Sequence, residues 1–200
     1  IGYLSTTGVY GDHQGDWVDE TTKVKGDNER TKSRVVAERK WMNLYETHQK
    51  PVHIFRLAGI YGPGRGVVSR LRKGLDHLTY KEGQVFSRIH VYDIVRALVA
   101  SIHQPQAGAI YNICDDSPAP SHEAGEFAAQ AMGLEVPPLV DWKEAGLSEM
   151  AREFYNSNRR VKNERIKQLL PEEEWLYPTY KEGIMADIKS LGLAKEYEND

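Results

Sequence analysis

The chain has 200 residues, 40% of them hydrophobic, and a net charge of −3 at neutral pH. That composition provides for a core in one domain, or one domain with a small lobe, and argues against a general nucleic-acid-binding protein. The chain contains no run of 18 apolar residues, so no membrane span is predicted, and no targeting segment is visible. The single cysteine, Cys114, cannot form an internal disulfide and indicates a reducing compartment, either the cytoplasm or an organelle stroma or matrix. Its apolar neighbours predict a buried, unreactive thiol.

Short apolar runs alternate with longer helical patterns along the chain. The run GYLS predicts a first strand at residues 2–5, and a second strand is expected at 52–62. Between them, helical spacing links Ala37, Trp41, Leu44, Tyr45 and His48, which predicts a helix from about 28 to 48 that ends before Pro51. The remaining expected elements are a short helix at 67–75, a strand at 84–91, a helix at 92–103, a strand at 109–114, a helix at 121–132 capped by Gly133, and helices near 144–154, 162–170 and 180–191.

This alternation predicts the fold class α/β, with a Rossmann-like, doubly wound and largely parallel sheet. We expect residues 1–135 to be the C-terminal part of a Rossmann-like domain and 136–200 to form a small substrate lobe. The first strand is apolar on both faces, which is typical of an interior strand. We therefore expect that the N-terminal half of the sheet is missing from this chain. A separate chain or upstream residues would then pair with residues 1–4.

Three hydroxyl residues, Ser5, Thr6 and Thr7, lie at the end of the first strand. In open α/β sheets ligands bind beyond the carboxyl ends of strands, so these hydroxyls can contact a substrate oxygen. They can equally stabilise the turn that follows. A second turn, at residues 62–66, contains three glycines and a proline and can bring its backbone close to a ligand, although a plain turn explains it as well. The arginine and lysine clusters at 70–73 and 159–162 are interpreted as solvated helix faces.

Several motifs occur in a fixed order along the chain: LSTTGVYG, a helix ending in AERKW, RLAGIYGPGR, RIHVYDIVRAL, IYNICDD and the late YPTYKEG at 177–183. Together they resemble the extended short-chain dehydrogenase/reductase family of the NAD(P)-dependent epimerase/dehydratase type, in its atypical branch, over nearly the whole chain. The resemblance implies a Rossmann-type domain that binds NAD or NADP, a smaller substrate lobe and a nucleotide-sugar-like substrate. The glycine fingerprint that binds the cofactor's pyrophosphate is not in these 200 residues.

The family's catalytic set is a Ser or Thr, a Tyr and a Lys. By spacing from Val9 the hydroxyl position matches Thr6, which we take as the candidate catalytic residue. By spacing from Glu38 the Tyr and Lys positions hold Arg30 and Arg34. Arginine stays protonated and cannot exchange a proton as tyrosine does, but it can bind a phosphate or carboxylate. Two solvated arginines on an exposed turn are the alternative.

The resemblance implies further site residues. The cofactor-binding set is Ser5, Thr6, Thr7, Arg30, Arg34, Ala58, Gly59 and Tyr61, and the substrate or anion set is Arg65 and Arg88. Phe86 stands where the family usually has an arginine for the substrate diphosphate, and Arg88 lies on the same strand face. His90 is expected to be a packed structural histidine and Asp93 a helix N-cap. No Cys/His spacing predicts a metal site.

Three hypotheses for function remain at this level. The first is an NAD(P)-dependent epimerase/dehydratase-type enzyme that uses Thr6 and an unrecognised acid/base. The second is a catalytically silent module that senses the cofactor or serves as an assembly subunit. The third is a scaffold with a vestigial site. The replacement of the Tyr/Lys pair by Arg30 and Arg34 favours the second and third, while the hydroxyl cluster and glycine loop favour a retained ligand.

Overall fold

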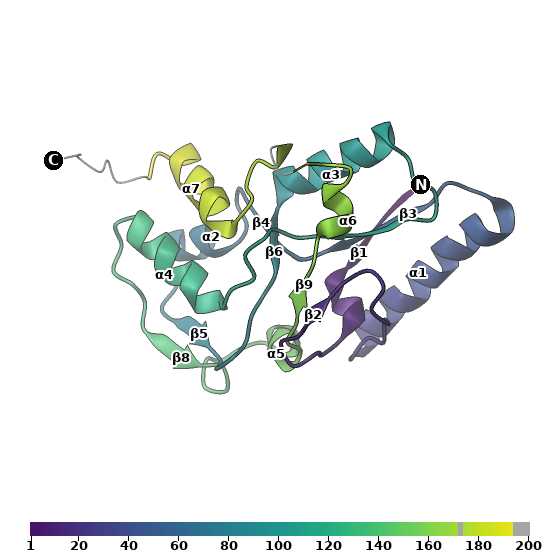
Figure 1. The fold of residues 1–200 in the computed structure, drawn as a ribbon. Coiled ribbons are helices and arrows are strands. Elements are labelled where there is room, and N and C mark those ends of the chain that lie inside the picture. Colours follow the sequence, from purple (N-terminus) through teal and green to yellow (C-terminus); the bar gives the residue numbers. More distant parts are fainter. Residues whose placement is uncertain (172–173, 194–200) are drawn as a thin grey trace.

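The computed structural model describes residues 1–171 and 174–193. Its centre is a three-stranded parallel sheet in the order β1-β3-β7, made of β1 (Gly2–Thr6), β3 (His53–Leu57) and β7 (Ile110–Ile113) (Figure 1). The register sets Ser5 opposite Arg56, and Arg56 opposite Asn112. These parallel strands joined through helices confirm the expected α/β, Rossmann-like class.

Two long helices flank this sheet. Figure 1 shows α3 (Val91–His103) above the strands and α1 (Glu29–His48) below them. Helix α1 begins at Asn28, which forms a reciprocal capping box with Thr31, and ends at Gln49 in the left-handed conformation. The sequence places Pro51 directly after this end, so the expected helix boundaries are confirmed.

The other strands of the described residues form three parallel pairs: β2 (Trp17–Val18) with β9 (Arg160–Val161), β4 (Gly59–Tyr61) with β6 (Arg88–His90), and β5 (Leu78–Tyr80) with β8 (Leu139–Asp141). The remaining helices are the 3₁₀ turn η1 (Thr7–Tyr10), α2 (Val67–Arg72), α4 (Ser121–Ala131), α5 (Glu149–Asn156), α6 (Glu164–Lys167) and α7 (Tyr180–Ser190). Segments far apart in sequence therefore meet around the central sheet.

Some predicted boundaries are wrong. The expected strand at 52–62 is two strands, because the chain changes partner at Ala58: its N–H donates to Ile113 O, whereas the N–H of Gly59 donates to Ser87 O. The expected strand at 84–91 is regular only over β6, although Phe86 pairs with Ala119 in an isolated bridge. The helices expected at 144–154 and 162–170 are shorter or displaced, and they form α5 and α6.

Three residue-level predictions were also testable. Cys114 is fully buried and its thiol donates to Val161 O, so the prediction of a buried thiol is confirmed. His90 is buried and pairs with Asp187, as expected of a structural histidine. The prediction for Asp93 is wrong: His90 caps α3 by accepting from the N–H of Tyr92, while Asp93 accepts from two backbone N–H groups, at Leu176 and Tyr177.

The core consists of two clusters of buried hydrophobic residues. One surrounds the central sheet and includes Phe55 and Tyr111, and the other joins α2, α4 and α7 and includes Tyr61 and Ile184. Both clusters draw on residues before and after position 135, so the boundary between 1–135 and 136–200 stays a prediction. No helix in the described part of the chain has the length and apolarity needed to cross a membrane.

Candidate active site

A cavity of about 630 Å³ lies beyond the carboxyl ends of β1 and β3, where α2, α5 and α7 approach the sheet. This is the position at which open α/β sheets bind ligands. All ten residues predicted for the site line this one cavity: Ser5, Thr6, Thr7, Arg30, Arg34, Ala58, Gly59, Tyr61, Arg65 and Arg88. The structure thus brings the candidates together, while their individual roles stay predictions.

Thr6 sits at the end of β1 and caps η1. Its Oγ1 accepts a hydrogen bond of 3.1 Å from the N–H of Gly8. A threonine hydroxyl has one donor and two acceptor positions, so this bond leaves the hydroxyl proton free to donate. The turn-stabilising role and the ligand-contacting role proposed from the sequence are therefore compatible in one side chain.

Ser5 serves a buried polar network instead. Its hydroxyl donates to Glu38 Oε1 at 2.6 Å, and Glu38 in turn receives two nitrogens of Arg56, the nearest at 2.8 Å. Arg56 also donates to the hydroxyl of Tyr10, which donates to Asn112 Oδ1. Burial raises the pKa of Tyr10 to about 12, against the opposing charge of Arg56. This network fixes β1, α1, β3 and β7 behind the cavity.

Arg30 and Arg34 both reach the cavity from the first turns of α1. Nη1 of Arg34 donates to the hydroxyl of Tyr3 at 3.1 Å. The guanidinium carbon of Arg30 lies 5.7 Å from the centre of the Phe154 ring, a cation–π arrangement. Both side chains are exposed, and within residues 1–171 and 174–193 neither forms an ion pair with a carboxylate. Each can therefore bind an anion without breaking an existing pair.

The glycine-rich turn brings Arg65 to the cavity. Gly62 and Arg65 exchange both backbone hydrogen bonds, and Nε of Arg65 donates to Ile60 O. Gly66 has φ +97°, and a Cβ there would lie 3.0 Å from Cβ of Tyr61. A side chain at this position would therefore cause both backbone strain and a close steric contact. The turn therefore requires a glycine at position 66, and Gly66 and the first residue of α2, Val67, also line the cavity.

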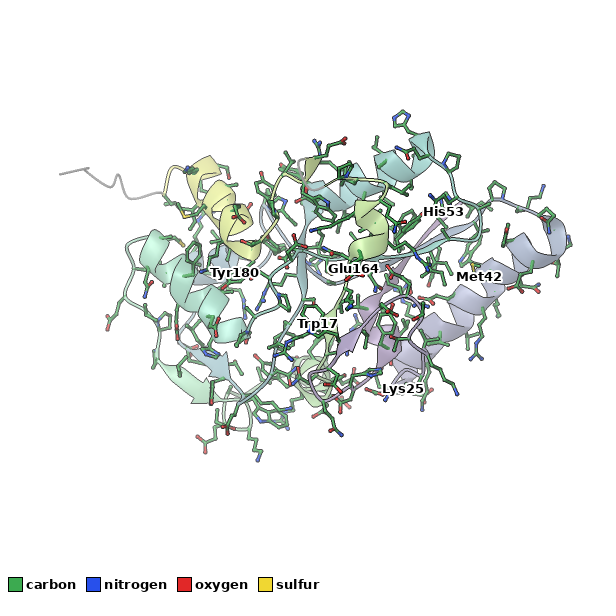
Figure 2. The ribbon with its side chains drawn as sticks, in the orientation of Figure 1. Trp17, Lys25, Met42, His53, Glu164 and Tyr180 are labelled. Carbon is green, nitrogen blue, oxygen red and sulfur yellow. The ribbon has the colours of Figure 1, made fainter. Side chains whose placement is uncertain are left out.

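Most hydrogen-bond donors of Arg88 are already used within the protein. Its guanidinium donates to three backbone carbonyls, those of Phe86, Ala119 and Pro120, at 2.9–3.1 Å. It also lies over the ring of Tyr180, which Figure 2 labels at the start of α7. Burial lowers the pKa of Arg88, while the charge of Asp115 opposes this shift. A substrate contact by Arg88 stays a prediction, since most of its donors are already used.

The Tyr61 hydroxyl is buried and has no hydrogen-bond partner in the described part of the chain. Burial raises its pKa, and the charges of Asp115, Asp93 and Asp187 add to the shift. A Cβ on Gly183 would collide with this hydroxyl, so the close approach of α7 requires a glycine there. Gly183 belongs to the late YPTYKEG motif, and its function in this chain is to accommodate Tyr61.

Residues from α5 and the segment after it were missed by sequence reasoning. Phe154, Tyr155 and Arg159 line the cavity, and Nη1 of Arg159 donates to Gly11 O at 3.1 Å. The interpretation of 159–162 as a solvated helix face is wrong, because this segment includes β9, which pairs with β2. The only sequence signal for the segment was its cluster of basic residues.

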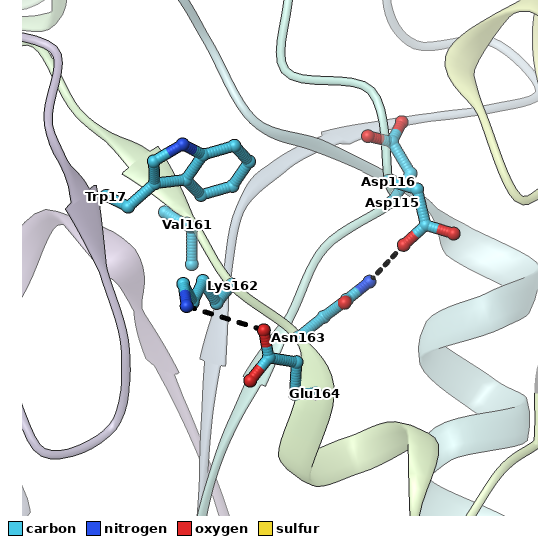
Figure 3. Close-up of a pocket in the computed structure, with 7 residues that line it drawn as sticks. All are labelled: Trp17, Asp115, Asp116, Val161, Lys162, Asn163 and Glu164. Carbon is cyan, nitrogen blue, oxygen red and sulfur yellow. Dashed lines mark hydrogen bonds and ion pairs between the residues drawn. The ribbon is translucent and has the colours of Figure 1, made fainter.

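A second, smaller cavity of about 170 Å³ lies beside Trp17 and the end of β7 (Figure 3). Two of its three carboxylates are already paired, Asp116 with Lys167 and Asn163, and Glu164 with Lys162, whereas Oδ2 of Asp115 has no hydrogen-bond partner among the described residues. None of the ten predicted site residues lines it. The larger cavity is therefore the candidate site.

The comparisons with known proteins define the family. The model of the "NAD dependent epimerase/dehydratase family" matches residues 1–114, so the chain belongs to that family. Among curated proteins, Protein YeeZ of Escherichia coli K12 is 34% identical over 148 residues, which is 72% of this chain and 50% of YeeZ. The chain thus spans about half the length of the curated relatives it matches.

Solved structures show the same fold. A functionally unknown conserved protein from Silicibacter pomeroyi is 50% identical, with a TM-score of 0.88, over 95% of this chain and 66% of its own. The dTDP-glucose 4,6-dehydratase of Bacillus anthracis, in complex with NAD, is 22% identical with a TM-score of 0.74, over 98% and 62%. The UDP-glucuronic acid 4-epimerase of Bacillus cereus, in complex with UDP-glucuronic acid and NAD, is 15% identical with a TM-score of 0.74, over 95% and 61%.

Proposed function

We propose that this chain supplies the substrate-facing part of an NAD(P)-binding site in which Arg30 and Arg34 replace the usual Tyr/Lys pair. One observation carries the proposal. Both arginines line the same cavity as Thr6, and neither lysine nor histidine occurs among the described residues of its lining. The nicotinamide cofactor, when bound, supplies hydride chemistry, and nicotinamide dinucleotide is present in the two dehydratase and epimerase structures of the same fold.

The residues of the cavity suit the nicotinamide side of such a cofactor. The Thr6 hydroxyl has a proton to donate, and Arg34 presents a fork suited to a phosphate or carboxylate oxygen. The pyrophosphate-binding glycine fingerprint is not in these 200 residues. Cofactor binding by the whole protein therefore needs residues outside this chain. NAD and NADP are both candidates.

The usual proton relay has no support in this cavity. Arginine cannot act as the acid and base that tyrosine supplies. Tyr61 and Tyr180 line the cavity, but burial raises the pKa of each, which is the wrong direction for a base at neutral pH. The hydroxyl of Tyr155, which also lines the cavity, already forms a hydrogen bond of 2.8 Å with the hydroxyl of Ser121. These features favour a cofactor-binding module that is catalytically silent in the family's usual chemistry.

The second part of the proposal concerns the outer edge of β1. Within the described residues β1 pairs only with β3, and Leu4 on it is 44% exposed. An open edge carries backbone N–H and C=O groups that another strand can pair with. We propose that a strand from the rest of the protein, or from a partner chain, pairs with β1.

Calorimetric titration of the natural full-length protein with NAD and NADP tests the cofactor site. We expect Arg34→Ala to weaken binding about tenfold to a hundredfold, since a charge-assisted contact contributes roughly 1.5–3 kcal/mol. Arg72→Ala is the control, because Arg72 is an exposed arginine outside the cavity. Equal affinities in all three proteins at low salt would contradict the role of Arg34.

A turnover assay tests the silence of the site. The protein is mixed with NAD or NADP and a panel of nucleotide sugars, the substrate class implied by the family resemblance, and cofactor reduction is followed. We expect no turnover. Turnover with a bell-shaped pH profile would show a working acid and base that the described residues do not reveal.

A further inference from the structure

The walls of the large cavity are of two chemical kinds. One wall, formed by α5, the loop before it and the segment before β6, is apolar and aromatic, with these members: Val85, Phe86, Leu147, Ala151, Phe154 and Tyr155. Phe86 and Tyr155 pack edge to face, with ring centres 5.3 Å apart. Such a surface binds apolar groups and leaves hydrogen-bonding groups of a ligand without partners.

The charge of the cavity is strongly positive. Among the described lining residues, six are arginines and two are carboxylates: Arg30, Arg34, Arg65, Arg70, Arg88 and Arg159 against Glu153 and Asp187. Asp187 is already paired with His90. A cavity lined mainly by one sign of charge concentrates ligands of the opposite sign, so the lining favours an anionic ligand.

Arg30 lies where the apolar wall meets the arginine-lined part of the cavity. It extends from α1 over the ring of Phe154 on α5, so its cationic head and the phenyl ring are presented together to the cavity. Phe154 is 52% exposed, whereas the next residue of α5, Tyr155, is buried. An exposed phenyl ring beside a guanidinium that forms no ion pair in the described part of the chain has the form of a binding surface for a molecule with an anionic end and an apolar body.

We propose that the cavity binds an amphipathic organic anion. Its carboxylate or phosphate head contacts Arg30, and its aryl or branched-alkyl body packs against Phe86, Phe154 and Tyr155. The proposal rests on the proposed function and narrows the substrate of that site. A nucleotide sugar matches this wall less well, because its sugar hydroxyls would find no hydrogen-bond partner on the rings of Phe86 and Phe154.

Calorimetric titration of the natural full-length protein, with and without NADP, tests the proposal. The probes are 4-phenylbutyrate and phenethyl phosphate, each with an anionic head and an aryl body. Acetate and inorganic phosphate test the head alone, 3-phenylpropanol tests the body alone, and UDP-glucose represents the nucleotide sugars. We expect the two amphipathic anions to bind at least tenfold more tightly than any other probe. The ratio between 4-phenylbutyrate and phenethyl phosphate identifies the head group.

Two variants test which residue contacts the apolar body of the ligand and which contacts its anionic head. Phe154→Ser should weaken the amphipathic anions about tenfold and leave inorganic phosphate unchanged, whereas Arg30→Gln should weaken every anion. Met150→Ser is the matched control, because Met150 is an exposed apolar residue of α5 outside the cavity lining. The proposal is overturned if UDP-glucose binds most tightly, or if Phe154→Ser behaves as Met150→Ser does.

Cofactor titration separates this inference from the proposed function. If NADP binds but the amphipathic anions do not, the substrate class is wrong and the cofactor site stands. If the anions bind and neither dinucleotide does, the cofactor site is wrong and the substrate class stands.

Discussion

The Ser5 hydroxyl donates to Glu38 Oε1 over 2.6 Å, and so joins the end of β1 to the middle of α1. Glu38 is 4% exposed and pairs with Arg56, which is 3% exposed. The strand end that lines the cavity is thus held from behind by a buried charge pair. The position of Thr6 and Thr7 depends on this pair.

We expect Glu38→Ala to destabilise the protein by about 3–5 kcal/mol, because it leaves the buried charge of Arg56 without its partner. The measurement is urea denaturation followed by circular dichroism. Glu46→Ala, an exposed change on the same helix, is the control and should cost less than about 0.5 kcal/mol. A similar cost for both would mean that Glu38 and Arg56 do not hold β1 to α1.

Gly183→Ala should destabilise the protein by about 1–3 kcal/mol, because the added methyl group meets the Tyr61 hydroxyl. Tyr61→Phe alone should be neutral or stabilising, since it removes a buried hydroxyl that has no partner among the described residues. In the double variant the phenylalanine should recover part of the loss. Thermal denaturation of the four proteins measures this, and strict additivity would count against the contact.

The stability of the protein should depend on Asp115. This carboxyl is 2% exposed, and burial, with the charges of Asp116 and Glu182, raises its pKa to about 8 against the effect of Arg88. Because the folded state then binds the proton more tightly than the unfolded state, this group stabilises the fold below the usual carboxyl pKa. That contribution is lost as pH rises toward 8, at roughly 1.4 kcal/mol per pH unit.

Asp115→Asn removes that dependence. Urea denaturation at several pH values from 5 to 9 should show the variant gaining stability relative to wild type as pH rises, with the gain levelling off above about pH 8. Asp16→Asn, at an exposed position, should show no such trend. Parallel curves for wild type and Asp115→Asn would refute the raised pKa.

The 200-residue chain alone should bind NAD and NADP poorly and should aggregate through the open edge of β1. The reasons are that these 200 residues contain no pyrophosphate-binding glycine fingerprint and that the outer edge of β1 has no partner strand within residues 1–171 and 174–193. Calorimetry and light scattering, with the natural full-length protein alongside, measure both properties. Micromolar cofactor binding by a monomeric 200-residue chain would contradict this prediction.

The sequence by itself determined the order and type of most elements. The recurrence of Ala37, Trp41, Leu44 and Tyr45, with Pro51 after them, predicted α1, because a helix repeats every 3.6 residues and proline ends it. The hydroxyls at the end of β1 and the glycines at 62–66 likewise marked the strand end and the turn that line the cavity. These features depend on neighbours within a few residues, which a sequence displays directly.

Only the tertiary structure decided which strands pair and which distant residues complete the site. The chain changes partner between Ala58 and Gly59, and the apolar pattern does not mark this point, because apolar residues continue on both sides of it. Arg159 reaches Gly11 across 148 positions, and Phe154 meets Arg30 from another helix. Hydrogen-bond partners and packing contacts of this kind are set by where the folded chain returns, which local periodicity does not encode.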